Sequence, residues 1–201
     1  MQISRKIGGI ILAGGEGKRI GGLNKGLVEF RSEFMINHIL LKFKPYLDTV
    51  IISANRDLET YRSFGAAVYP DCAEWKHMGP LSGLVSCYPF LPSHLGGVLV
   101  VPCDTPLLPD DLVIKLAEKL FEQPDNQIAY AVTKDCVHPS IFLSRNEINA
   151  ELSAHMKTGK RSLRSWIFSH KSVGVYFDNE YAFANINEYE TLRDLEDGST
   201  K

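Results

Sequence analysis

Short apolar runs alternate with longer segments of helical periodicity along the first half of the chain. The runs at 7–12 and 48–53 predict two strands, and a short third strand is predicted at 67–69. Between the first two strands, Ile36, Ile39, Leu40 and Phe43 share the spacing of one helical face, which predicts a helix over 35–43. Strand, helix and strand in this order are typical of βαβ units and of a largely parallel sheet.

The second half of the chain continues the alternation less regularly. The run 97–101 is apolar throughout, as expected for a central strand covered on both faces, and Pro109 opens a predicted helix that extends to about 121. Further strands are predicted at 127–133, 140–143 and 172–177, and further helices near 145–157, 161–168 and 188–196. Because the chain has neither an internal repeat nor a linker, the pattern predicts one three-layer, Rossmann-like α/β domain over residues 1–201. Its sheet should be mostly parallel, with antiparallel strands in the later part.

Composition narrows the classes of function. A formal net charge of -2 argues against nucleic acid as a partner, since general polyanion binders carry a large basic excess. No apolar run approaches the roughly 20 residues of a membrane span, and the start of the chain lacks the pattern of a signal peptide, so we expect a cytoplasmic protein without a membrane partner. The four cysteines show no paired short spacing, which favours reduced thiols without a metal.

The segment 10–26 reads IILAGGEGKRIGGLNKG, an apolar strand that ends in a loop rich in glycine and basic residues. Backbone N–H groups of such a loop can converge on phosphate oxygens, while Arg19 and Lys25 neutralise the remaining charge. The dinucleotide fingerprint fails because its last glycine position is Ile20, and the P-loop fails because its first glycine position is Leu12. The loop therefore predicts a triphosphate site of another kind, although the glycines could also merely permit a tight turn between solvated bases.

Asp104 follows the buried strand at 97–101 closely. Ligands of open α/β sheets gather at the carboxyl ends of the strands, so Asp104 is expected in the same crevice as the glycine-rich loop. One carboxylate suits Mg²⁺, which keeps several waters and takes substrate phosphates as further ligands; the alternative is that Asp104 caps a turn through neighbouring amides, a common role of Asp in loops. Asp71, after the third strand and before MGPLSG at 78–83, either accepts from a ligand or simply ends its strand.

These segments together resemble the bacterial molybdenum cofactor guanylyltransferases, which attach GMP to molybdopterin. The resemblance spans almost the whole chain and is carried by LAGGEGKRIGGLNKGL at 12–27, SANR at 53–56, PDC at 70–72 with GPLSG at 79–83, and PCDTPLLP at 102–109. Weaker matches are HPSIFL at 138–143, GKRSL at 159–163 and FANINEYETL at 183–192. The resemblance implies a nucleotidyltransferase fold, with a nucleotide-binding part over about 1–110 and a pterin-binding part over about 111–196. It also implies GTP and molybdopterin as substrates and Mg²⁺ as cofactor. Proteins of cofactor biosynthesis or molybdoenzyme maturation are the implied partners.

The resemblance implies roles for single residues. Asp104 would bind magnesium, Arg19 would steady the leaving pyrophosphate, and these two with Lys25 would form the catalytic set. The implied nucleotide contacts are Leu12, Ala13, Gly14, Gly15, Lys25, Ser53, Asp71 and Asp104. The implied pterin contacts are Arg161, Asn185 and Asn187. The chain departs from the family pattern at Ile20, which is usually Met; at Asn24, which is usually Asp; and at Ser53, which is often Asn.

Three rival interpretations remain open on the sequence. A cytidylyltransferase acting on the same pterin would generally have LAAG where this chain has LAGG at 12–15, so the resemblance favours guanine. Sugar-phosphate nucleotidyltransferases tend to be longer and carry a different loop, and a non-catalytic partner that delivers molybdopterin need not retain Lys25 and Asp104. A phosphate monoester has a second pKa near 6 and needs no general base, so His138 is interpreted as structural or as orienting the pterin.

Overall fold

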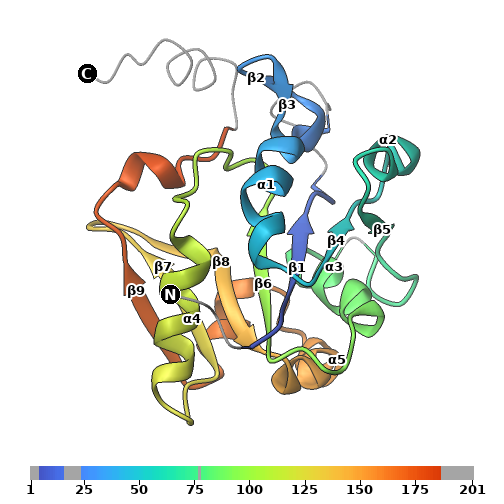
Figure 1. Ribbon diagram of the computed structural model, residues 1–201. Helices are drawn as coiled ribbons and strands as arrows, with labels where there is room; N and C mark the ends of the chain where they lie inside the picture. The colour runs from blue at the N-terminus through green and yellow to red at the C-terminus, as the bar shows by residue number, and fades with distance from the viewer. Residues whose placement is uncertain (1–4, 16–23, 77, 187–201) are drawn as a thin grey trace.

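The computed structural model describes residues 5–15, 24–76 and 78–186, and its centre is a seven-stranded sheet (Figure 1). The strands lie in the order β5-β4-β1-β6-β8-β7-β9. Their bounds are Ile7–Leu12 for β1, Thr49–Ser53 for β4, Ala67–Tyr69 for β5, Gly97–Pro102 for β6, Ile128–Val132 for β7, Val137–Arg145 for β8 and Ser172–Tyr176 for β9. Only β8 runs against its neighbours β6 and β7, so the sheet is mostly parallel, as predicted, with its antiparallel strand in the later part.

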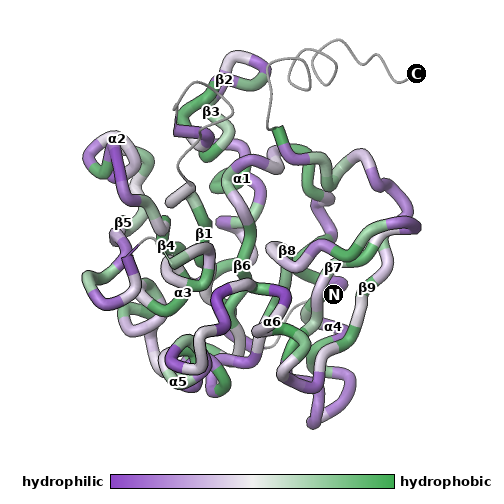
Figure 2. Tube along the Cα trace, turned by 180° about the vertical axis from the view of Figure 1, so that it is seen from behind, coloured by the Kyte–Doolittle hydropathy of each residue, from purple (hydrophilic) through white to green (hydrophobic). Residues whose placement is uncertain are grey.

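The helices cover both faces of the sheet. On one face lie α1 (Met35–Phe43) and α4 (Leu112–Glu122), and on the other α3 (Pro80–Cys87), α5 (Leu152–Lys157) and α6 (Leu163–Ile167), as the opposite views of Figures 1 and 2 show. The short helix α2 (Leu58–Arg62) connects β4 to β5, and the hairpin strands β2 (Glu29–Phe30) and β3 (Glu33–Phe34) form a separate sheet. Single 3-10 turns are η2 (Lys25–Leu27), η3 (Lys44–Tyr46), η4 (Tyr88–Phe90), η5 (Glu147–Glu151) and η6 (Glu180–Phe183). The three-layer prediction is therefore confirmed.

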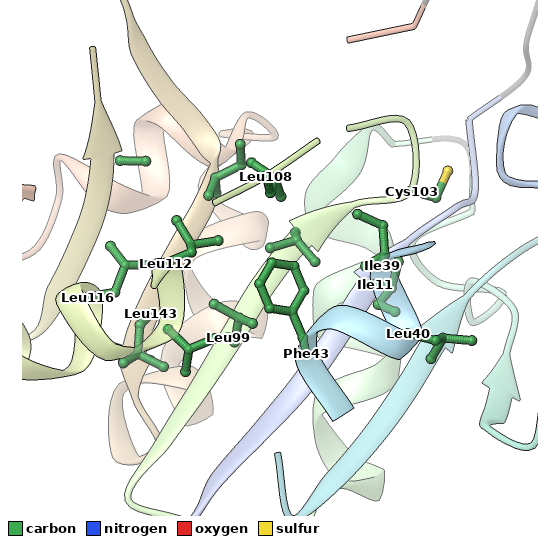
Figure 3. Packing of buried hydrophobic residues seen from close by; sticks show 14 of the residues in the cluster. Ile11, Ile39, Leu40, Phe43, Leu99, Cys103, Leu108, Leu112, Leu116 and Leu143 are labelled. Atoms are coloured by element: carbon green, nitrogen blue, oxygen red, sulfur yellow. The ribbon is translucent and has the colours of Figure 1, made fainter. Parts of the chain in front are cut away.

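Two apolar clusters hold the layers together, one on each face of the sheet. On the first face Phe43 of α1 packs near Ile11 and Leu99 of the central strands, and Leu112 and Leu116 of α4 extend the cluster toward β8 (Figure 3). Each such side chain, fully buried, contributes about 1.5–3 kcal/mol by the removal of apolar surface from water. Successive residues of each strand thus contribute to opposite clusters, as Ile10 and Ile11 of β1 do.

Several predicted bounds need correction. The helix expected from Pro109 begins at Leu112, because the N–H of Leu112 closes a turn on the carbonyl of Pro109 before the regular helix starts. The segment 145–157 is divided into η5 and α5, and the strand predicted at 140–143 extends over Val137–Arg145. The helix predicted at 188–196 lies outside the described residues.

None of the helices in the described part of the chain combines the length and apolar content needed to cross a lipid bilayer. All four cysteines are free thiols.

Candidate functional site

The carboxyl ends of the three parallel strands β4, β1 and β6 lie side by side and form the carboxyl edge of the sheet; their amino ends form the amino edge. Leu12 of β1 is paired with Ser53 of β4 on one side and with Pro102 of β6 on the other. Backbone hydrogen bonds extend this alignment: the N–H of Ala13 donates to the carbonyl of Ser53 (2.8 Å), and the N–H of Cys103 donates to that of Leu12 (3.1 Å). The residues that follow these strands are therefore held side by side although they are far apart in the sequence.

A pocket of about 530 Å³ opens at this edge. Its described lining residues are Leu12, Ala13, Gly14, Gly15, Lys25, Ser53, Asn55, Asp71, Gly79, Pro80, Gly83, Pro102, Cys103, Asp104, Ser140 and Leu163. Gly15 and Asp104 thus share one hollow, as the sequence predicted. The volume is that of a typical site for a small ligand or cofactor.

Lys25 and Asp104 form an ion pair inside the pocket. The Nζ of Lys25 lies 2.8 Å from Oδ2 of Asp104, and the two side chains are only 23% and 10% exposed. Asp104 comes directly after β6 and Cys103, whereas Lys25 is carried by the 3-10 turn η2. The pairing places a cation and an anion on the same wall, so that the pocket can offer a positive group to phosphate oxygens and a carboxylate to a metal ion.

Asn55 links the glycine-rich loop to Asp71. Its Nδ2 donates to Oδ2 of Asp71 (3.0 Å) and lies 3.4 Å from the carbonyl oxygen of Gly14, while its Oδ1 accepts from the N–H of Asp71 (2.9 Å). Asp71 is thereby held at the pocket wall by two bonds to one amide. Asn55 is not among the residues predicted from the sequence; its place just beyond β4, at the ends of the strands where ligands gather, is the signal that indicates it.

Ser53 lines the pocket but its hydroxyl faces helix α3. The residue is 1% exposed, and a Cβ built on Gly83 of α3 would lie 2.3 Å from the Ser53 Oγ. Burial raises the pKa of the Cys87 thiol to about 12, and a hydrogen bond with Ser53 partly opposes that rise. Gly83 therefore permits a close contact between β4 and α3, and the Ser53 hydroxyl forms a hydrogen bond with the Cys87 thiol.

Arg161 and Asn185, two of the three residues predicted for the pterin, lie near the pocket and are not among its described lining residues. Arg161 is exposed, and its carbonyl lies 3.3 Å from the position that a Cβ on the pocket residue Gly79 would take. Asn185 is also exposed and precedes Ile186, whose N–H donates to the carbonyl of Asp104 (2.9 Å). Arg19 and Asn187, predicted for the pyrophosphate and the pterin, lie outside the described residues.

His138 is not among the described residues that line the pocket. Its Nε2 lies 3.0 Å from the Thr133 hydroxyl, and its ring stacks on Phe183 with centroids 4.7 Å apart. Burial lowers the pKa of His138, so the ring is neutral at physiological pH. These contacts favour the structural role over a catalytic one.

A metal ion in this pocket would depend on Asp104. The described residues contain no group of three or more His, Cys, Asp or Glu side chains that could surround an ion. A single carboxylate with substrate phosphates is nevertheless the usual donor set of Mg²⁺ at nucleotide sites, and Asp104 meets that requirement.

Comparison with known proteins gives the same fold and a family. Residues 9–173 match the model of the MobA-like NTP transferase domain. The chain is 36% identical over 198 residues to a molybdenum cofactor guanylyltransferase of Ralstonia pickettii, with 94% of this chain and 95% of the relative covered. A molybdenum cofactor guanylyltransferase of Cupriavidus metallidurans is 38% identical over 191 residues, with 92% of each chain covered.

Solved structures share the architecture at lower identity. The molybdopterin-guanine dinucleotide biosynthesis protein A of Archaeoglobus fulgidus superposes with a TM-score of 0.71 at 20% identity, over 94% of this chain and 97% of that one. Rv0371c of Mycobacterium tuberculosis superposes with a TM-score of 0.75 at 18% identity, over 96% and 99%. The matching domain and the sequence relatives establish that the chain belongs to the MobA-like NTP transferase family and, within it, to the molybdenum cofactor guanylyltransferases.

Proposed function

We propose that this protein transfers GMP from GTP to the terminal phosphate of molybdopterin, with release of pyrophosphate. The observation that carries the proposal is the meeting of the glycine-rich loop, Lys25, Asp71 and Asp104 around one pocket, in a chain whose relatives carry the name of that activity. A cytoplasmic location belongs to the same proposal, because GTP is a cytoplasmic metabolite.

The transfer is a substitution at phosphorus. An oxygen of the molybdopterin phosphate forms a bond to the α-phosphorus of GTP, and the bond from that phosphorus to the oxygen bridging to the β-phosphate breaks. Pyrophosphate leaves with the electron pair. Because a phosphate monoester is largely ionised at neutral pH, the nucleophile has no proton to lose, and the neutral His138 outside the pocket fits a reaction without a general base.

The role of the protein in this reaction is to bring two polyanions, GTP and the molybdopterin phosphate, together. Gly14 and Gly15 follow β1 and line the pocket, where their backbone N–H groups would meet the phosphates, and the Lys25 ammonium would supply a positive charge. Such preorganised donors act in a partly dry site, where they stabilise developing charge more than water does. Asp71, held by Asn55, would accept from the nucleoside.

Asp104 would hold the Mg²⁺ ion that accompanies the triphosphate. The carboxylate is 10% exposed and faces the pocket beside Lys25, so both an anionic ligand and a neutralising cation are present. When bound, the ion supplies positive charge that lowers the cost of charge build-up on the phosphate oxygens. The Mg²⁺ requirement and the role of Arg19 at the pyrophosphate are parts of the proposal.

Arg161 and Asn185 are proposed for the pterin side of the site. Both are exposed at the border of the pocket, next to Gly79 and to the backbone of Asp104 respectively, where a second substrate would approach the first. Asn187 is proposed there by the resemblance alone. Proteins of cofactor biosynthesis or molybdoenzyme maturation would receive the product.

The test is a transfer assay with purified protein, Mg²⁺ and molybdopterin, with GTP, CTP and ATP supplied in turn. We expect pyrophosphate release and a guanine dinucleotide product, identified by mass spectrometry, only when GTP is supplied. Preference for CTP would instead identify a cytidylyltransferase. Tight GTP binding without pyrophosphate release, with all substrates present, would identify a non-catalytic binding protein and refute the proposal.

A further inference from the structure

We propose that Asn24 is a positioning residue for triphosphate binding: its side-chain amide, held between Asp57 and Tyr61, fixes the turn that carries Lys25. The inference rests on the proposed function, because it assigns Lys25 to the phosphates of GTP. It concerns a residue that is not among the described lining residues of the pocket and acts on the ligand through its neighbour in the chain.

The Asn24 side chain is buried and uses both ends of its amide. The residue is 8% exposed; its Nδ2 donates to Oδ2 of Asp57 (3.2 Å), and its Oδ1 accepts from the Tyr61 hydroxyl (2.5 Å). Tyr61 is fully buried, and burial holds its pKa well above the usual value, so the hydroxyl keeps its proton and remains a donor. Both partners of the amide belong to one short segment: Asp57 is the residue before helix α2, and Tyr61 lies within that helix.

The backbone of Asn24 begins the turn that presents Lys25. Its carbonyl accepts from the N–H of Leu27 (2.9 Å), and the carbonyl of Lys25 accepts from the N–H of Val28 (3.1 Å). Gly26 lies against the same tyrosine: a Cβ at Gly26 would stand 2.5 Å from the Tyr61 Oη. Side chain, backbone and the glycine contact therefore fix one short turn, and its cation reaches Asp104, 79 positions later in the chain, at 2.8 Å.

The chemistry of the contact requires an amide. Asp57 is an acceptor and the Tyr61 hydroxyl is a donor, so the group between them must donate at one end and accept at the other. A carboxylate at position 24 would keep the bond from Tyr61 but would place a second negative charge against Asp57. Lys25, Arg56 and Asp104 are charged groups near this junction in the described part of the chain, and repulsion of the turn by Asp57 would move Lys25 relative to Asp104.

The test exchanges the donor and the acceptor of the hydrogen bond between Asn24 and Asp57. In Asn24→Asp the donor is lost, and we expect KM for GTP to rise about tenfold while kcat changes less than about threefold, because a displaced Lys25 would weaken the binding of the triphosphate in the ground state and the transition state alike. In the double variant Asn24→Asp, Asp57→Asn the bond is restored with its direction reversed and the total charge unchanged. We expect KM to return to within about threefold of the wild-type value.

Asn126→Asp is the matched control. Asn126 is also 8% exposed and also donates its amide to a single acceptor, the carbonyl of Lys119 (2.9 Å), but at the opposite edge of the sheet. This variant should lower the melting temperature without raising KM for GTP. If Asn24→Asp leaves KM unchanged, or if the double variant is as poor as the single one, the positioning role is refuted.

A second variant covers the case in which Asn24→Asp does not fold. Tyr61→Phe removes one of the two bonds to the amide without adding charge, and it should raise KM for GTP about threefold; an unchanged KM would overturn the inference. Calorimetric titration with GTP and Mg²⁺ separates this inference from the proposed function. Should the wild-type protein bind GTP but transfer no GMP, the function fails, while the dissociation constants of the variants still decide the role of Asn24.

Discussion

Buried polar side chains lie at both ends of the central strands, at the amino edge and at the carboxyl edge of the sheet, but the pocket lined by Lys25 and Asp104 lies at the carboxyl edge. At the amino ends of the central strands, Asn149 is 1% exposed, and its Nδ2 lies within reach of the Ser144 hydroxyl (3.0 Å) and the carbonyl of Arg145 (3.1 Å). At the carboxyl ends, Lys25 and Asp104 face a pocket of about 530 Å³. Both sets are polar, internal and hydrogen-bonded.

The difference lies in what the polar atoms face. The Asn149 amide in η5 donates its hydrogens to Ser144 and Arg145 of β8, so it stabilises the attachment of η5 to the end of that strand. Lys25 and Asp104 border a hollow, where a ligand can add to or replace the contacts that they make with each other. Burial of polar groups therefore does not identify a site unless a space of ligand size adjoins them.

The largest effect is expected at the carboxyl edge from Asp104→Asn. Asparagine has the same size but lacks the charge that would hold the proposed Mg²⁺ ion, so kcat for GMP transfer should fall about 100- to 1,000-fold. Pyrophosphate release measures the loss, and a melting temperature within a few degrees of the wild-type value shows that the fold survives. Near-normal turnover would remove Asp104 from the metal role.

Lys25→Ala should have the next largest effect. Loss of the ammonium would remove the proposed charge-assisted contact to the triphosphate, so KM for GTP should rise about 10- to 100-fold; calorimetry measures the matching change in the dissociation constant. Lys171→Ala is the control at the amino edge, because Lys171 also pairs with a carboxylate, that of Asp125, at 2.9 Å. Equal effects of the two substitutions on GTP binding would contradict the contrast between the edges.

The carboxyl edge of the sheet could be predicted from the sequence more fully than the contacts between distant segments. The parallel strands were predicted because burial on both faces produces continuous apolar runs such as 97–101, and their common polarity then places Asp104 beside the glycine-rich loop. Helix α1 was predicted with its observed bounds, since its apolar face has a clear helical period. Local pattern and the geometry of parallel sheets suffice for these features.

Other features depend on contacts between distant segments. The hairpin of β2 and β3 has two residues in each strand, too few for any period to be recognised. Strand β8 was predicted too short because Pro139 interrupts it: Phe142 pairs with Tyr130 and His138 with Ala131, and the register shifts between them, where proline has no N–H to donate. The contact of Tyr61 with Asn24 spans 37 positions, and no local pattern indicates it.

Gly14→Ala should produce a smaller effect at the carboxyl edge. A Cβ at this position would lie 3.0 Å from Nδ2 of Asn55, the atom that donates to Asp71. Displacement of Asn55 should loosen Asp71 and raise KM for GTP about threefold. The substitution should be non-additive with Asn55→Ala, because both act on the same contact; additive effects in a double-mutant cycle would show that Gly14 acts by another route.

The smallest effect on transfer is expected from Asn149→Ala at the amino edge, which instead tests what the internal network contributes. The substitution leaves the carbonyl of Arg145 and the hydroxyl of Ser144 without the amide that they contact, at a cost of about 1–3 kcal/mol in the free energy of unfolding. For a chain of this length each kcal/mol lowers the melting temperature by about 2–4 °C, which thermal unfolding measures. KM for GTP at a temperature well below the transition should stay at the wild-type value, because Asn149 is buried and its amide hydrogens are donated to groups of the chain itself. A raised KM together with an unchanged melting temperature would mean that the amino edge takes part in binding, and the two ends of the sheet would no longer differ in kind.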